Sequence, residues 1–360
     1  MKKILSVVSV FLVAFVLVAC GPQETYKIAM ITDIGDVDDQ SFNQGTWEGI
    51  VEYAEEHNIS HKYYRPNEQT DEQYNNQIDI AVAGGAEIVI TPGFLFAGPI
   101  ATAQAKYPDV KFVILDAAPE TVAANTLAVL FTETESAFYA GYAAVKDGFT
   151  ELGFMGGLPF PSVITFGIGF IAGAYKAADE MGLNDYAFDP AYYTYVNGFR
   201  PTPAIKTMAS TWYSSGAQVI HVAAGGAGAS VWDAADDVAG KYVVGVDSNQ
   251  AGFNARVISS ALKKVGEAAY QALDAFYSDE WDGGKTIRLS SVDGAVGLPT
   301  DAASWRWSTF TVAQYETIFN QVVAGTVDVP DTVAQLYTFV SALGYTLDPA
   351  FETAIPGTAS

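Results

Sequence analysis

An acidic stretch near the start of the chain carries the residue types best suited to bind a ligand or take part in a reaction. Residues 32–44 read Thr-Asp-Ile-Gly-Asp-Val-Asp-Asp-Gln-Ser-Phe-Asn-Gln. Ser41 suits the N-cap of a helix, where its hydroxyl would accept from an early backbone N–H and the acids before it would face the positive helix end. Capping does not account for Phe42, an aromatic residue at the first exposed turn, which is placed to stack on a flat ligand. The stretch therefore predicts a polar binding site beside an aromatic ring.

Other polar or glycine residues follow β-branched runs farther along the chain. Asp116 ends the run 111–116, Gly225 follows the run 218–223, and Asp247 ends the run 242–247. In open parallel sheets, ligands bind beyond the carboxyl ends of the strands. We therefore expect these residues and Asp33 to line one cleft.

Enzyme-like patterns in the chain are incomplete. The acids from Asp33 onward superficially resemble the calcium-binding cluster of nucleoside hydrolases, but that cluster needs an acid at the position of Ile31. The stretch also fails as an EF-hand loop, because Ser41 stands where a loop counted from Asp36 requires glycine. The histidines, at positions 57, 61 and 221, lack metal-ligand spacing. We expect no catalytic residue, metal or cofactor, and a nucleoside-cleaving enzyme remains the alternative class.

Alternation of short β-branched runs with amphipathic segments predicts an α/β fold with parallel sheets and crossover helices. One series of strands is expected at 27–31, 60–64, 87–91 and 111–116, and a second at 153–156, 191–195, 218–223 and 242–247. Helices are expected at 43–56 and 259–276. A Gly-x-Gly-x-x-Ala pattern at 167–172 lies inside another expected helix, without the strand and turn of a dinucleotide site, and predicts close packing.

The two series predict two α/β lobes. We expect the first lobe to span 20–131 and to be completed by about 255–304, with a boundary after a strand-like segment at 126–130. The second lobe is expected at 132–254, and residues 305–360 are expected to form a helical tail that packs on the lobes. Short segments that cross between the lobes would act as a hinge.

The N-terminus predicts export. Lys2 and Lys3 precede an apolar run that is shorter than the roughly 20 residues of a confident membrane span, which indicates a signal peptide at 1–19. Cys20, the only cysteine, follows in a sequence that resembles a bacterial lipobox, so we expect cleavage before it and a lipid on it; an uncleaved N-terminal anchor is the alternative. The formal net charge of −23 excludes a nucleic-acid partner, since no basic aromatic-bearing stretch offsets it.

The acidic stretch with Phe42 resembles the signature of the basic membrane protein family, the substrate-binding lipoproteins of ABC importers that include purine nucleoside receptors. Other segments resemble that family in the same order along the chain: 105–112, 153–157, 169–173, 223–228, 245–248 and 260–263. The resemblance implies a two-lobed, type I periplasmic-binding-protein-like fold. It also implies that the lobes close on a nucleoside, of the purine class, held between aromatic rings.

Matched to this chain, the family's rings are Phe42 and Phe199, with Phe166 and Tyr195 as open alternatives for the second ring. The sequence departs from the family at Arg200, near which many members carry an acid. The implied polar anchors are Asp33, Asn43 and Asp116 from the first lobe, followed by Gly225, Asp247 and Lys263.

The resemblance further implies a receptor on the extracytoplasmic face of the cell membrane, held by its lipid and serving an ABC permease. We expect it to act as a monomer. Another flat or sugar-like solute remains open as the ligand, and so does the surface hydrolase.

Overall fold

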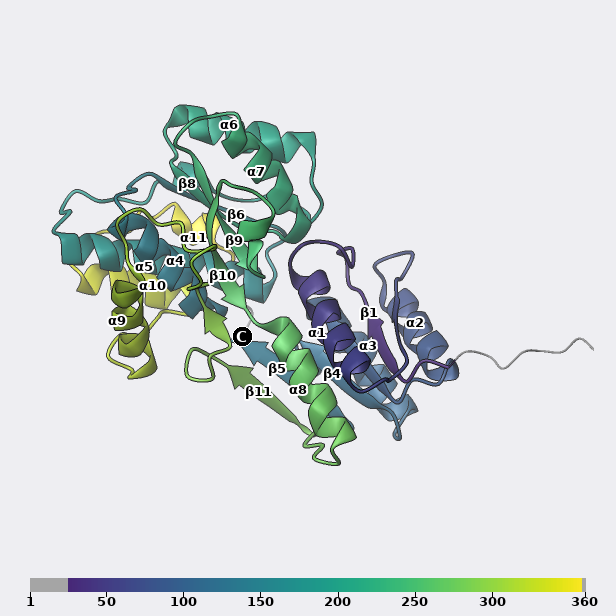
Figure 1. Ribbon diagram of the computed structural model, residues 1–360. Coiled ribbons are helices and arrows are strands. Elements are labelled where there is room, and N and C mark those ends of the chain that lie inside the picture. Colours follow the sequence, from purple (N-terminus) through teal and green to yellow (C-terminus); the bar gives the residue numbers. More distant parts are fainter. Residues whose placement is uncertain (1–24, 358–360) are drawn as a thin grey trace, which may run out of the picture.

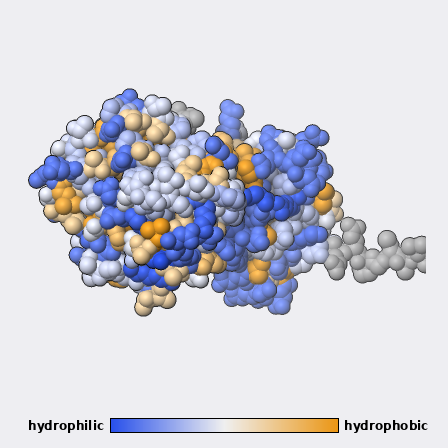
Figure 2. Space-filling view, turned by 90° about the horizontal axis from the view of Figure 1, so that it is seen from above, coloured by the Kyte–Doolittle hydropathy of each residue, from blue (hydrophilic) through white to orange (hydrophobic). Residues whose placement is uncertain are grey.

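The computed structural model describes residues 25–357 of the chain. The signal peptide and the lipidated Cys20 expected from the sequence lie outside the described residues. Within residues 25–357, no helix is both long and apolar enough to cross a bilayer. The surface seen in Figure 2 is mainly hydrophilic, with only small, scattered hydrophobic areas, as suits a body with a large net negative charge.

The described residues form two lobes, each built on a six-stranded sheet (Figure 1). The first sheet has the order β11-β5-β4-β3-β1-β2 and the second the order β12-β10-β9-β8-β6-β7, so the lobes repeat one plan. The strands of the first sheet are β1 Ile28–Ile31, β2 His61–Tyr64, β3 Ile88–Pro92, β4 Lys111–Leu115, β5 Thr126–Phe131 and β11 Lys285–Leu289. Those of the second are β6 Leu152–Gly156, β7 Tyr193–Tyr195, β8 Val219–Ala223, β9 Tyr242–Asp247, β10 Val257–Lys263 and β12 Val296–Gly297. Neighbouring strands run parallel except for β10 and β12, which pair antiparallel.

Helices cover both faces of the first sheet. Alternate residues of β1 point to opposite faces: Ile28 and Met30 pack toward α1 (Phe42–Glu56) and α8 (Val265–Tyr277), whereas Ala29 and Ile31 pack toward α2 (Asp71–Ala83) and α3 (Ala97–Lys106). Such apolar strands, buried on both faces, are typical of parallel sheets.

The second lobe has the same three layers and an additional one. Helices α4 (Glu133–Lys146) and α5 (Pro161–Met181) cover one face, and α6 (Pro203–Ser215) and α7 (Gly228–Asp236) cover the other. The tail helices α9 (Val312–Val323), α10 (Val333–Ala342) and α11 (Phe351–Ala354) join the core of α4 and α5, so the tail packs on the second lobe. Gly169 of the predicted glycine pattern lies within α5, where a Cβ would meet the Thr134 carbonyl oxygen at 2.1 Å, so this pattern does mark close packing.

Three short segments carry the chain between the lobes. They are Thr132 between β5 and α4, Lys264 between β10 and α8, and residues 290–295 between β11 and β12. Hydrogen bonds tie them together: the Thr132 N–H donates to the Leu289 carbonyl at 2.8 Å, and the Lys264 N–H donates to the Ala295 carbonyl at 2.9 Å. Side-by-side crossings of this kind suit a hinge.

The structure corrects the expected helix at 259–276. Residues 257–263 form β10, a central strand of the second sheet, and the helix begins only at Val265. The physical reason lies in the sequence: Val257-Ile258-Ser259-Ser260-Ala261-Leu262 is a buried run rich in β-branched and small residues, which a helical period also tolerates. Consequently the segment 255–304 is shared, with α8 and β11 in the first lobe and β10 and β12 in the second.

Candidate functional site

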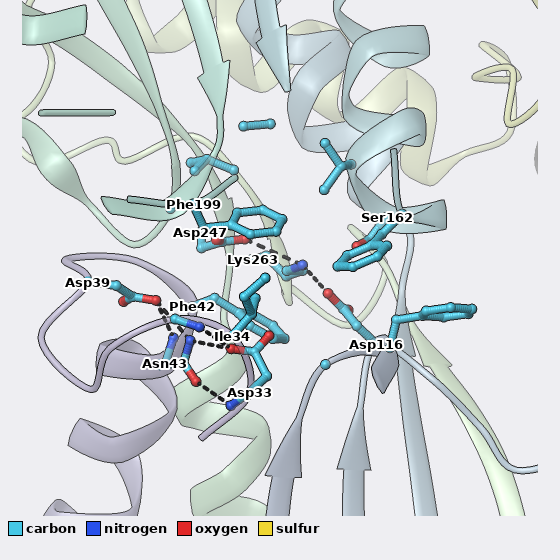
Figure 3. Close-up of a pocket in the computed structure, with 18 of the residues that line it drawn as sticks. Asp33, Ile34, Asp39, Phe42, Asn43, Asp116, Ser162, Phe199, Asp247 and Lys263 are labelled. Atoms are coloured by element: carbon cyan, nitrogen blue, oxygen red, sulfur yellow. Dashed lines mark hydrogen bonds and ion pairs between the residues drawn. The ribbon is translucent and has the colours of Figure 1, made fainter. Parts of the chain in front are cut away.

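A cavity of about 570 Å³, including the part that opens to solvent, lies between the lobes at the carboxyl ends of both sheets (Figure 3). Every residue that the sequence predicted for ligand contact lines it: Asp33, Phe42, Asn43, Asp116, Phe199, Gly225, Asp247 and Lys263. Phe166, one alternative for the second ring, also lines the cavity, whereas Tyr195 packs against the second-lobe core instead. The grouping is a structural finding, and contact with a ligand stays a prediction.

The first-lobe wall is a network of side chains in which Asn43 is the central donor. Its Nδ2 donates to Asp33 Oδ1 at 2.9 Å and to Asp39 Oδ2 at 3.0 Å, so its two amide hydrogens are already used. Asp33 Oδ1 also accepts from the Gly35 N–H at 2.8 Å, which leaves Oδ2 for the cavity. Burial raises the pKa of the Asp33 carboxyl to about 6, although these hydrogen bonds oppose the shift. The Asn43 side chain therefore serves mainly to orient the Asp33 carboxylate toward the cavity.

The start of α1 is capped differently from the prediction. Asp39 accepts from the backbone N–H groups of Ser41, Asn43 and Gln44 at 2.9, 3.0 and 3.1 Å. Ser41 makes no side-chain cap; its hydroxyl donates across the cleft to Asp247 Oδ2 at 2.6 Å. A carboxylate two residues earlier is the stronger acceptor for helix N–H groups, and this frees Ser41 to link the lobes.

Lys263 is the central cation of the site. It lies at the end of β10, almost fully buried, with its Nζ paired to Asp116 of the first lobe and 3.4 Å from Asp247 Oδ1 of the second. Burial alone would lower the pKa of Lys263, but the carboxylates of Asp116, Asp247 and Glu133 outweigh it and hold the pKa above its ordinary value. The ammonium group therefore stays charged and joins the two lobes.

Asp116 and Asp247 occupy equivalent places in the two lobes. Each follows or ends the corresponding strand, β4 or β9, and each has a left-handed backbone, with φ of 62° and 61°. Asp tolerates this region better than most residues. The turn directs both carboxylates at the same ammonium.

Glu133, the first residue of α4, is another buried carboxyl with a raised pKa. It is buried, and its Oε1 accepts from the Thr165 hydroxyl at 2.6 Å. Burial, and next the negative charge of Asp116, raise the pKa of Glu133 to about 7. The sequence prediction missed Glu133, which was interpreted only as an acidic helix start.

Aromatic rings form the remaining walls. The Phe42 ring lies 4.7 Å from Lys263 Nζ and the Phe166 ring 5.4 Å from it, within the range of cation–π attraction. Figure 3 shows Phe42 on the first-lobe side and Phe199 on the second-lobe side of the space around Lys263. Phe94 and Phe160 also line the cavity and were missed. Their signal was present, because each aromatic follows a strand and a glycine or proline at the same edge of its sheet.

Contacts at the rim hold the lobes together in this closed arrangement. Arg200, where the sequence departs from the family pattern, makes a two-pronged ion pair with Asp36 of the first lobe, at 2.6 and 2.9 Å. Gln250 Nε2 donates to the Gln40 carbonyl at 2.9 Å. The Arg200 side chain is 55 % exposed, so this pair contributes little on its own.

The cleft offers ligand-binding groups from both lobes. Within residues 25–357, no group of three or more His, Cys, Asp or Glu side chains is placed to hold a metal ion. Aromatic faces, carboxylates and one ammonium converge on an enclosed space that both lobes build. This arrangement defines a two-lobed solute-binding protein with its ligand site between the lobes.

Comparison with known proteins gives the family. Residues 26–331 match the model of the family described as Bmp, ABC transporter substrate-binding protein PnrA-like, and the chain belongs to this family. Membership implies a ligand and a permease partner.

Individual relatives agree with this membership. The chain is 30 % identical over 284 residues to basic membrane protein B of Borreliella burgdorferi, covering 76 % of this chain and 80 % of the relative. It is 28 % identical over 300 residues to the ABC transporter nucleoside-binding protein BmpA of Lactococcus lactis, covering 77 % of this chain and 82 % of that protein.

Solved structures share the fold. An ABC transporter solute-binding protein from Aeropyrum pernix superposes with a TM-score of 0.74 at 21 % identity, over 89 % of this chain and 97 % of that one. A second, from Conexibacter woesei, has a TM-score of 0.68 at 20 % identity, over 85 % and 99 %. The expected two-lobed α/β fold and the expected family are thereby confirmed.

Proposed function

We propose that the protein captures a purine nucleoside between its lobes and delivers it to an ABC permease. The observation that carries the proposal is the pairing, in one enclosed cleft, of the facing rings Phe42 and Phe199 with the Asp116–Lys263–Asp247 cluster. Two rings suit the faces of a flat base. Carboxylates and an ammonium suit the hydroxyls of a sugar, which both donate and accept hydrogen bonds.

The proposal divides the ligand between two parts of the cleft. Asp33 Oδ2, next to Phe42, would accept from an N–H on the edge of the base, and the backbone at Gly225 would let the ligand approach closely. The cluster around Lys263 would hold the ribose. The nucleoside-binding relative from Lactococcus lactis supports this choice over another flat or sugar-like solute.

Closure would work by population shift. Phe42 and Asp33 belong to one lobe and Phe199 and Lys263 to the other, so a ligand contacts them together only when the lobes are closed. The ligand then favours closure by its differential affinity for the closed form. We further propose that the chain is cleaved before Cys20 and that a lipid on the Cys20 sulfur holds the receptor at the outer face of the cell membrane. We also propose that the receptor acts as a monomer.

The test is calorimetry with inosine, guanosine and adenosine against their free bases and ribose. We expect binding of at least one purine nucleoside and weaker binding of each fragment. Tighter binding of a free sugar, or no heat with any nucleoside, would overturn the ligand class.

The hydrolase alternative is tested with the same samples. We expect inosine recovered intact by chromatography after prolonged incubation with the protein. Release of hypoxanthine with repeated turnover would replace the receptor by an enzyme. Mass spectrometry of the intact lipoprotein from membranes, with Cys20→Ser as the control, tests the anchor.

A further inference from the structure

Phe94 is a large apolar side chain that lines the cleft and is nevertheless 45 % exposed. It begins a short 3-10 turn, Phe94–Phe96, directly after β3 of the first lobe. Its ring centroid lies 5.7 Å from that of Phe160, at 32° between the ring planes. Phe160 belongs to the second lobe, so this ring pair spans the cleft.

Phe160 is held stiffly on its own side. It precedes α5, and Pro159 and Pro161 flank it and restrict the backbone on both sides. Its ring stacks on Phe199, with centroids 5.9 Å apart and 26° between planes. The rings of Phe94, Phe160 and Phe199 therefore form one row from the first lobe into the second.

The equivalent turn of the second lobe shows that the fold does not require a ring at this place. After β8, the position that corresponds to Phe94, the first residue of the 3-10 turn, is Gly225. There a Cβ would lie 3.7 Å from the Phe199 side chain of the same lobe, and the turn carries no ring of its own. In the first lobe, Gly93 at φ 116° makes the turn, so the turn does not depend on the phenyl ring that follows it. An exposed phenyl at Phe94 thus needs a reason outside the fold of its own lobe.

We propose that Phe94 and Phe160 form an aromatic clasp that stabilises the closed lobes and slows release of the ligand. The rings meet only when the lobes are closed, so their attraction favours the closed form and opposes the opening that precedes dissociation. The inference rests on the proposed function only in that a ligand is held between the lobes. A contact that exists only after closure acts mainly on the dissociation rate.

The test is stopped-flow release of a bound purine nucleoside from wild type and Phe94→Ala. Aromatic pairs contribute about 0.5–1.5 kcal/mol, so we expect release to be roughly 2- to 12-fold faster, with association within about twofold of wild type. The matched control is Phe253→Ala: Phe253 is equally exposed, at 45 %, and stacks on Trp232 at 6.1 Å outside the cavity. Release from Phe94→Ala at the rate of the control would overturn the clasp.

A double-mutant cycle separates the clasp from two independent ligand contacts. If the rings act through each other, Phe94→Ala adds no further acceleration in a Phe160→Ala background. Fully additive effects would mean that each ring acts separately and would refute the pair.

A ligand-free measurement distinguishes failure of the clasp from failure of the ligand assignment. Small-angle X-ray scattering of the ligand-free protein should show a more open average for Phe94→Ala than for wild type or Phe253→Ala. An unchanged profile overturns the clasp even when nucleoside binds. An opened profile supports it even when the ligand proves to be another solute.

Discussion

The two lobes repeat one plan of strands and yet give different walls to the cleft. Both place an aspartate with left-handed backbone, Asp116 or Asp247, at the same strand end. The loop after β1 is acidic and carries Asp33 and Asp39, whereas the loop after the equivalent strand, β6, carries Phe160. The repeated scaffold therefore fixes where side chains meet, and the loops decide what each lobe offers.

The largest effect is expected where the two lobes share one charge. Lys263→Met would leave the buried carboxylates of Asp116 and Asp247 facing each other without a cation. Removing one partner of a buried pair costs about 3 kcal/mol or more, so nucleoside affinity should fall at least about a hundredfold by calorimetry. Lys264→Met is the control, because that neighbour pairs with Glu267 at the surface. Similar losses in both variants would deny Lys263 its central role.

The next effect tests whether the rings from the two lobes act as equals. Stacking on a base contributes about 1–3 kcal/mol per ring, so Phe42→Ala and Phe199→Ala should each weaken binding by about 5- to 150-fold. Calorimetry checks both, and Phe166→Ala shows whether that rival ring is the second face. Unchanged affinity in Phe42→Ala would remove Phe42 from the site, and a larger loss at Phe166 than at Phe199 would reassign the second ring.

A third prediction concerns one buried group in each lobe, His221 and Asp33, whose shifted pKa values make stability depend on pH in opposite directions. His221 lies buried in the second lobe, and burial lowers its pKa to about 4 from 6.5. Between pH 6.5 and pH 4, His221 is protonated in the unfolded chain but stays neutral in the folded protein. The contribution of His221 to the free energy of unfolding is therefore fully present above pH 6.5 and is lost as the pH falls toward 4. Asp33 in the first lobe, with its raised pKa, has the opposite sign and gains stability as the pH falls through 6.

Thermal unfolding from pH 7 to pH 5 checks this opposition. Wild type should lose up to about 2 kcal/mol more than His221→Gln over that range. Equal losses in the two proteins would show that His221 does not titrate between folded and unfolded states. Asp33→Asn should lose more stability than wild type on acidification, since it lacks the stabilisation that protonation of the Asp33 carboxyl provides.

The smallest expected effect tests whether different side chains bind the base and the sugar of the ligand. Asp247→Asn should weaken nucleoside binding by about 1 kcal/mol while leaving the free base nearly unaffected, because this carboxylate faces the proposed sugar site. Asp33→Asn should weaken base and nucleoside alike. Parallel losses for base and nucleoside in Asp247→Asn would contradict the proposed split.

Much of the fold and of the cleft was predictable from sequence, for a physical reason. Parallel strands gather their carboxyl ends at one edge, so Asp33, Asp116 and Asp247 could be placed together from local patterns alone. Residues 259–263 were predicted as the start of a helix because short apolar runs fit both periods, and only the pairing of β10 with β9 shows that they form a strand.

Contacts across the cleft were less predictable. Ser41 satisfies every local rule for a helix cap, and its bond to Asp247 depends on a residue from the other lobe. The contact between the rings of Phe94 and Phe160 likewise joins residues of different lobes. Local sequence carries no signal for such pairs until the lobes are placed.

The three crossings between the lobes have a consequence for how the protein can be divided. Neither lobe is one continuous piece of chain: the first sheet needs β11 from beyond the second lobe, and the second sheet needs β10 and β12. A gene fragment ending before residue 257 would leave both sheets with an open edge and α1 without α8. Folding must therefore bring distant parts of the chain together before either half is complete, which predicts slow folding and no separately stable half.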